Sequence, residues 1–267
     1  MKPSLRHEKS DSIAIVGMGR VGSSLAMALK RGVKGYSLHS FVSARTTSFD
    51  SLSSRNGPAV IILATKDDAI EEISRRVLNS AGKNLKLIVH LSGSRPSTIL
   101  PARSGVARLT MHPIQTFAGK DPTLFADANF MVSSGEPSAI RWGRRFARAL
   151  GGGEVTELPG ELLPLYHTIV SIGANFTTLL IWVVEDLSAR AELDPKVMKR
   201  MIGPLMRRSL ANALSKSAAK ALTGPLARRD LNTIAAHRRA LRGSSPEIRR
   251  LYDAFVAYGL SKSNDPV

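Results

Sequence analysis

The stretch that decides the fold is Ile13-Ala14-Ile15-Val16-Gly17-Met18-Gly19-Arg20-Val21-Gly22. Its four aliphatic residues predict a short buried strand, and a helical pattern follows over residues 23–30. Glycines spaced Gly-x-Gly-x-x-Gly between a strand and a helix are the fingerprint of a dinucleotide-binding turn. Gly17 would permit the turn, Gly19 would let the backbone approach a pyrophosphate, and Gly22 would allow close strand–helix packing. The main-chain N–H groups of Arg20 and Val21 would then bind phosphate. The alternative is a glycine turn that serves packing alone.

The segment after the second predicted strand, 38–42, distinguishes between nicotinamide cofactors. An NAD site places a carboxylate about 20 residues past the glycines, on the ribose hydroxyls. Here the segment reads Ser43-Ala44-Arg45-Thr46, and no acid follows until Asp50. Arg45 can pair with a 2′-phosphate, while Ser43 and Thr46 can donate hydrogen bonds to it. This favours NADP, unless Arg45 is simply a surface residue of a basic protein.

Strand and helix patterns alternate over the first part of the chain and predict an α/β fold with a parallel sheet. Further strands are expected at 59–64, 87–91, 108–111, 129–133 and 154–158, with helices at 68–78 and 138–150. After Pro159 only helical patterns remain, with one long helix at 162–191 and N-caps at Asp194, Asp230 and Ser245. We therefore expect a dinucleotide-binding domain over residues 11–160 and an all-helical domain over 161–262.

Composition narrows the classes of function. The 267 residues include no cysteine, which excludes a disulfide scaffold, a thiolate nucleophile and an iron–sulfur cluster. The net charge of +17 would attract anionic ligands or nucleic acid, but no helix-turn-helix, zinc-finger or aromatic single-strand pattern is present, so no specific nucleic-acid partner is expected.

The apolar stretch 168–184 bears on location. Its 17 residues fall short of the roughly 20 that a membrane span needs. We expect this stretch to be buried in a core or a dimer interface, with no membrane association. The first ten residues contain no apolar run of a secretory signal, and a cytoplasmic location is expected.

Small and polar residues follow the third and fourth predicted strands, where the carboxyl ends of a parallel sheet form a ligand crevice. Ala64 and Thr65 are candidate cofactor contacts, and Ser92 is a candidate neighbour of the nicotinamide. Asp67 or Asp68 is expected to cap the helix that follows.

Two histidines are candidates for acid–base chemistry, which imidazole performs well near neutral pH. His167 shares one face of the long helix with Ser171 and Asn175, because the three are spaced i, i+4, i+8. We expect His167 to act as general acid/base, with His112 and Asn175 orienting substrate. The alternative is a set of interhelical hydrogen bonds. No metal is expected, since neither HExxH spacing nor a cysteine cluster is present.

The chain resembles bacterial proteins that join a Rossmann-like domain to a helical domain of unknown function, commonly labelled as NADP oxidoreductases. The resemblance rests on Ile15 to Gly22, His90-Leu91-Ser92-Gly93, His112-Pro113-Ile114-Gln115-Thr116-Phe117, Tyr166-His167, Asn175, and Ala221 to Asp230. It implies an N-terminal Rossmann-type sheet, bound NADP, and a helical domain that forms a homodimer.

More distantly the chain is similar to pyrroline-5-carboxylate reductase, prephenate dehydrogenase and the 6-phosphogluconate dehydrogenase group. Prephenate dehydrogenases carry a His-Pro pair whose histidine contacts substrate, which His112-Pro113 resembles, and a Gly-Ser pair near the nicotinamide, which Gly93-Ser94 matches. The 6-phosphogluconate dehydrogenase group uses a helix lysine followed one turn later by asparagine. This chain has no lysine there, and His167 and Asn175 are two turns apart.

Together these features predict an NADP-dependent oxidoreductase. Hydride would pass between the nicotinamide and a C=O or C=N carbon of a small, anionic metabolite. The alternative hypothesis is a non-catalytic NADP(H)-binding sensor or regulatory protein, because a fold does not establish an activity.

Overall fold

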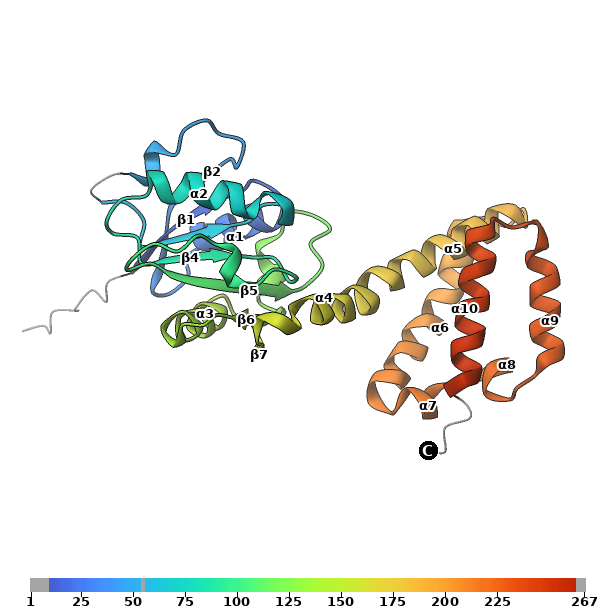
Figure 1. Cartoon of the computed structure of the whole chain (residues 1–267). Coiled ribbons are helices and arrows are strands. Elements are labelled where there is room, and N and C mark those ends of the chain that lie inside the picture. Colours follow the sequence, from blue (N-terminus) through green and yellow to red (C-terminus); the bar gives the residue numbers. More distant parts are fainter. Residues whose placement is uncertain (1–9, 54–55, 263–267) are drawn as a thin grey trace, which may run out of the picture. The chain divides into compact units, whose positions relative to one another are not determined.

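Seven strands form one sheet in the order β2-β1-β3-β4-β5-β6-β7, in a computed structural model that describes residues 10–53 and 56–262 (Figure 1). All seven predicted strands are present within these residues. Their bounds are β1 Asp11–Val16, β2 Tyr36–Val42, β3 Val60–Leu63, β4 Leu87–His90, β5 Ala107–Ile114, β6 Asn129–Ser133 and β7 Val155–Glu157.

The sheet is parallel except at one pairing. Strands β1 to β5 pair in parallel, as does β6 with β7, but β6 runs antiparallel to β5. The predicted parallel sheet is therefore interrupted at this one pair. A parallel crossover usually contains a helix, whereas only the short 3₁₀ turn η4 (Pro122–Phe125) lies between β5 and β6.

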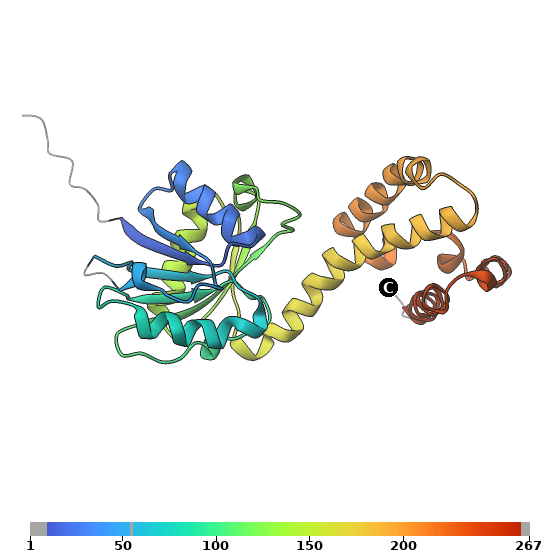
Figure 2. The same cartoon turned by 90° about the horizontal axis from the view of Figure 1, so that it is seen from above.

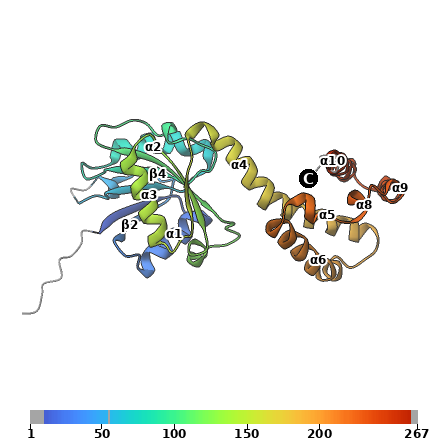
Figure 3. The ribbon, with the colours of Figure 1, turned by 90° about the horizontal axis from the view of Figure 1, so that it is seen from below.

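Helices cover both faces of the sheet, as Figures 2 and 3 show. On one face α1 (Arg20–Arg31) and α3 (Pro137–Ala149) pack on alternate residues of the strands, such as Ile13 and Ile15. On the other face α2 (Ile70–Ser80) packs on the residues between them, such as Ala14 and Val16. Because every strand side chain in the centre is covered, the strands read as continuous aliphatic runs. Short 3₁₀ turns complete the unit at η1 Asp50–Leu52, η2 Asp67–Ala69, η3 Ser97–Ile99 and η5 Gly160–Leu162.

The chain divides into two compact units, Met1–Gly173 and Ala174–Val267. The first unit extends past residue 160 into α4 (Leu163–Ser171), because Leu163 is fully buried and Tyr166 bonds to His112 of the sheet. A π-helical turn, η6 (Ile172–Phe176), follows α4.

The second unit is helical, as expected. Asp194 caps the N-terminus of α6 and Asp230 that of α9, each accepting from a backbone N–H in the first turn. Two side-chain pairs join α9 to α10: His237 with Tyr252, and Arg238 with Asp253. The helices are α5 Thr177–Arg190, α6 Pro195–Ser215, α7 Ala218–Ala221, α8 Gly224–Ala227, α9 Leu231–Ala240, the short η7 Leu241–Gly243 and α10 Pro246–Lys262.

The second unit has little core of its own. Among its described residues only two apolar side chains are buried, Ile234 and Val256. Large apolar side chains such as Met201, Leu205 and Leu214 are 68%, 69% and 79% exposed. The apolar stretch of the long helix is likewise not buried, so the expectation of a place in the chain's own core is wrong. By length and composition alone, the helix Gly160–Arg190 could also cross a membrane, because an 18-residue window within it has a mean hydropathy of 1.5.

Candidate functional site

The glycine turn after β1 is tight on one side and open on the other. Gly17 has φ +120°, and a Cβ on it would lie 2.3 Å from the carbonyl oxygen of Ala64. A Cβ on Gly22 would lie 2.0 Å from the Gly17 carbonyl oxygen. A Cβ on Gly19 would meet no atom within 4 Å. Gly17 and Gly22 therefore serve the packing of β1, β3 and α1, while Gly19 presents bare backbone at the surface.

The first turn of α1 lies directly beyond this open glycine. Gly19 is the N-cap in an extended conformation, and no side chain caps the helix. The first N–H groups of a helix have no partner within it, and its dipole favours an anion there. Arg20 and Val21 supply such N–H groups, and both residues are at least partly exposed. An anion can therefore approach this turn without displacing a protein side chain.

The loop after β2 carries the residues predicted to bind a 2′-phosphate. The Ser43 hydroxyl accepts from the Arg45 N–H at 3.1 Å, and the Ser43 carbonyl accepts from the Thr46 N–H at 3.2 Å. The Thr46 hydroxyl donates to the Ser48 carbonyl at 2.9 Å. Arg45 itself is exposed. The structure thus fixes the backbone around Arg45 and leaves its guanidinium accessible.

Ala64 and Thr65 lie at the carboxyl end of β3, beside the glycine turn. The Ala64 N–H donates to the Val16 carbonyl at 2.8 Å, and the Ala64 carbonyl is the group against which Gly17 packs. Thr65 is partly exposed next to it. Both residues are placed at the edge of the sheet that the glycine turn also occupies.

Asp67 connects this edge to the loop after β4. Its Oδ2 accepts hydrogen bonds from the hydroxyls of Ser92 and Ser94, each at 2.8 Å. Neither η2 nor α2 has a side-chain N-cap, so the prediction that Asp67 or Asp68 caps this helix is wrong. The Ser92 hydroxyl also accepts from the N–H groups of Ser94 and Arg95, at 3.2 and 3.3 Å. Ser92 therefore holds its loop in shape, and its contact with a nicotinamide stays a prediction.

His90, at the end of β4, stabilises the loop that contains Ser92. Its side chain is fully buried, its Nδ1 accepts from the Ser92 N–H at 3.3 Å, and its Nε2 lies 2.9 Å from the Thr110 hydroxyl. Since Thr110 donates to the Arg95 carbonyl, it accepts from His90, which places the proton on Nε2. Burial lowers the pKa of His90 to about 4, so this imidazole is neutral at physiological pH.

His112, Tyr166 and His167 come together above Gly93. The Tyr166 hydroxyl and His112 Nδ1 are 2.8 Å apart, and the ring centroids of His112 and His167 are 5.8 Å apart. A Cβ on Gly93 would lie 2.7 Å from His167 Cδ2 and 3.0 Å from His112 Nδ1. Glycine at this position is therefore what lets β5 and α4 bring both imidazoles against the loop after β4.

The two side chains that share this hydrogen bond, His112 and Tyr166, have shifted pKa values. Burial, followed by the neighbouring His167, lowers the pKa of His112 to about 4, although Asp67 acts in the opposite direction. Burial raises the pKa of Tyr166 to about 12. Near neutral pH the pair is a neutral imidazole and a protonated phenol, which suits orientation of a polar group better than release of a proton.

Two site residues were missed from the sequence. The position of Asp67 just before an amphipathic helix indicates a helix cap. No local pattern in the sequence indicates that its carboxylate binds Ser92, 25 positions later. Tyr166 stands next to His167, but its bond to His112 spans 54 positions of the chain. Asn175 lies in the second unit, so its role in orienting substrate stays a prediction. No group of three or more metal-ligating side chains is found in the described residues.

Residues 128–258 match the family model of a domain of unknown function, DUF2520. No curated protein matches the chain. Among solved structures it is similar to a "putative NADP oxidoreductase" from Bacteroides fragilis, at 22% identity and a TM-score of 0.77, covering 95% of this chain and 99% of that one. The fold class and the resemblance seen in the sequence are thereby confirmed.

Two more distant structures share the fold. One is the Plasmodium falciparum pyrroline carboxylate reductase with NADP bound, at 12% identity, a TM-score of 0.59, and coverage of 96% of this chain and 99% of that one. The other is an Aspergillus terreus reductive aminase in complex with NADPH and ethyl-5-oxohexanoate, at 17% identity, a TM-score of 0.64, and coverage of 95% and 94%.

Proposed function

We propose that the protein is an NADP-dependent oxidoreductase acting on a C=O or C=N carbon of a small, anionic metabolite. The observation that carries the proposal is the glycine turn: Gly17 and Gly22 are closed by packing, whereas Gly19 between them is open at an uncapped helix N-terminus. A pyrophosphate site requires both features: glycines that allow the tight turn and close strand–helix packing, and a glycine whose backbone the phosphates can approach. Structures of the same fold that contain NADP or NADPH support the choice of ligand.

The residues present fit the dinucleotide. The glycine turn and the first residues of α1 would hold the pyrophosphate. The 2′-phosphate would be held by Arg45 with Ser43 and Thr46. Between these two phosphate positions, the cofactor would lie beside Ala64 and Thr65. When bound, the nicotinamide supplies or accepts the hydride.

His167 is the proposed general acid/base, donating a proton to the oxygen or nitrogen of the reduced bond, or removing it in the reverse direction. The buried, neutral His112 and the Tyr166 hydroxyl would orient the polar atom of the substrate. Asp67 would keep the Ser92 loop, and with it Gly93, pressed under the two histidines.

We further propose a homodimer formed through the second unit. A stable domain needs a buried apolar core, and the described part of this unit buries only Ile234 and Val256 while leaving many more large apolar side chains exposed. Light scattering should give twice the 28.8 kDa of the chain. The L214E variant, which places a charge on the 79%-exposed Leu214, should weaken that assembly. A monomeric wild-type protein would contradict this.

Calorimetric titration of the full chain with NADPH and with NADH tests the cofactor. We expect tight NADPH binding, weaker NADH binding, and loss of the preference in R45A. Heat with neither nucleotide would remove the proposal. NADPH binding without turnover of any keto acid, hydroxy acid or imine would instead support the sensor hypothesis.

A further inference from the structure

We propose that Arg76 on α2 is a positioning residue that determines the preference for a 2′-phosphorylated dinucleotide. It would do so by holding the loop 43–50, which carries Arg45. The inference rests on the proposed function, because it concerns how the same cofactor site selects its ligand.

The loop is anchored at its far end and shaped by internal hydrogen bonds. Phe49 is 3% exposed and belongs to the hydrophobic core on the α2 side of the sheet. Between the strand and this anchor, the Thr46 hydroxyl bonds to the Ser48 carbonyl and the Asp50 N–H donates to the Ser48 hydroxyl at 3.1 Å. These bonds define the turns of the loop but leave the Thr46 carbonyl to be satisfied from elsewhere.

Arg76 satisfies that carbonyl. Its Nη2 donates to the Thr46 carbonyl oxygen, and its Cζ lies 5.2 Å from the centroid of the Phe49 ring. A planar guanidinium can stack on a ring and donate in its own plane at once, which a lysine ammonium cannot. Arg76 thereby fixes the peptide between Thr46 and Thr47, one residue beyond Arg45, relative to the buried end of the loop.

This contact bears on the 2′-phosphate in particular. Arg45 directly precedes Thr46, so an ordered Thr46 backbone would restrict where the exposed Arg45 side chain leaves the loop. A loop already ordered before binding avoids the entropy that a mobile one loses when it closes on a ligand. NADH has no 2′-phosphate and does not engage Arg45, so its affinity does not depend on this ordering.

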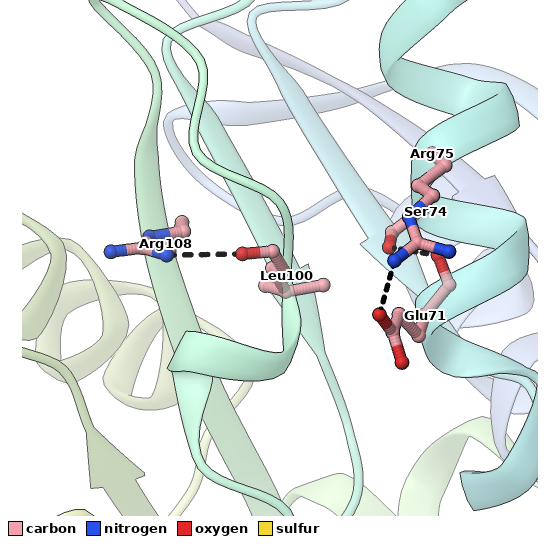
Figure 4. Close-up of polar contacts among 5 residues, drawn as sticks. All are labelled: Glu71, Ser74, Arg75, Leu100 and Arg108. Carbon is pink, nitrogen blue, oxygen red and sulfur yellow. Dashed lines mark hydrogen bonds and ion pairs between the residues drawn. The ribbon is translucent and has the colours of Figure 1, made fainter.

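The neighbouring Arg75 is a matched control. Figure 4 shows Arg75 on α2 reaching Glu71 one turn earlier on the same helix, where the Ser74 hydroxyl also bonds to the Glu71 carbonyl. The Arg75 side chain is 64% exposed. R75A removes the same charge, one residue away, and leaves the contacts to Thr46 and Phe49 intact.

The experiment is calorimetric titration of the full-length wild type, R76A and R75A with NADPH and with NADH. Loss of a hydrogen bond from a charged donor predicts an NADPH affinity about tenfold lower in R76A. NADH affinity should stay within about twofold by the same reasoning, since the bond does not serve it. R75A should match the wild type for both.

Three results would overturn the inference. One is equal weakening of NADPH and NADH in R76A, which would indicate general damage to the fold. Another is no change at all in R76A, and the third is the same NADPH loss in R75A, which would indicate a diffuse charge effect.

R76K keeps the test decisive if R76A does not fold. It retains the charge but not the planar stack, so we expect it to restore NADPH affinity only in part. Full restoration would overturn the inference. A wild type that binds neither nucleotide, or prefers NADH, would overturn the proposed function as well, whereas an NADPH-selective wild type with an indifferent R76A overturns only the role of Arg76.

Discussion

Alanine should be tolerated at Gly19 and destabilising at Gly22, because the two glycines face different surroundings. Gly19 has φ −69° and ψ −174°, which alanine adopts without strain, and its Cβ would meet no atom within 4 Å. A compatible Gly→Ala change stabilises by about 0.4–1 kcal/mol through the unfolded chain. Alanine is a poorer N-cap than glycine and opposes this gain, so G19A should unfold within about 2–4 °C of the wild-type temperature.

Gly22 differs because its Cβ would lie 2.0 Å from the Gly17 carbonyl oxygen. That atom belongs to the backbone, so α1 and the turn must move apart. Overpacking of this kind lowers the free energy of unfolding by about 1–3 kcal/mol. The higher helix propensity of alanine recovers only about 1 kcal/mol of that loss. G22A should consequently be destabilised, with a melting temperature several degrees lower.

Binding should separate the two variants from simple stability effects. In G19A a methyl group occupies the space through which a pyrophosphate reaches the N–H groups of α1. Loss of one hydrogen bond to a charged group corresponds to about 1.5–3 kcal/mol, or an NADPH affinity lower by about 10- to 150-fold. Thermal unfolding and calorimetric titration on the same preparations measure both quantities. A G19A protein that melts early, or that binds NADPH as the wild type does, would refute the division of roles between the glycines.

Three further predictions concern the residues around Gly93 and the buried His90. G93A should displace both imidazoles, since the new Cβ would lie 2.7 Å from His167 Cδ2; we expect shifted imidazole resonances and a loss of about 1–3 kcal/mol in urea unfolding, and unshifted resonances would contradict this. Y166F removes the hydroxyl bonded to His112 and should cost about 1 kcal/mol without changing NADPH affinity, so a calorimetric loss of NADPH binding would argue against the assigned role. His90 and His112 have pKa values lowered from 6.5 to about 4, so between these pH values the unfolded chain binds more protons than the folded one. The free energy of unfolding, measured in urea, should therefore fall as the pH drops from 6.5 to 4. A free energy of unfolding that does not change over this range would contradict the buried, neutral imidazoles.

Short-range patterns in the sequence determined the elements of the fold. The aliphatic run before Gly17, the later strand runs and the caps at Asp194 and Asp230 each act within a few residues, and the structure contains the elements they predict. The glycine spacing is likewise local, because one turn of chain joins the strand to the helix. The same logic failed for β6, since the direction of a strand depends on the path of its connection and not on its own residues.

The tertiary structure alone decided which side chains meet. Asp67 bonds to Ser92 and Ser94 because β3 and β4 are neighbours whose carboxyl ends share one edge. Arg76 reaches Thr46 across 30 positions of sequence, and Tyr166 reaches His112 across 54. The periodicity of a sequence segment indicates whether that segment is a helix or a strand and which of its faces is buried. Contacts between elements depend on sheet order, on helix placement and on the missing Cβ at Gly93, and these become fixed only when the chain has folded.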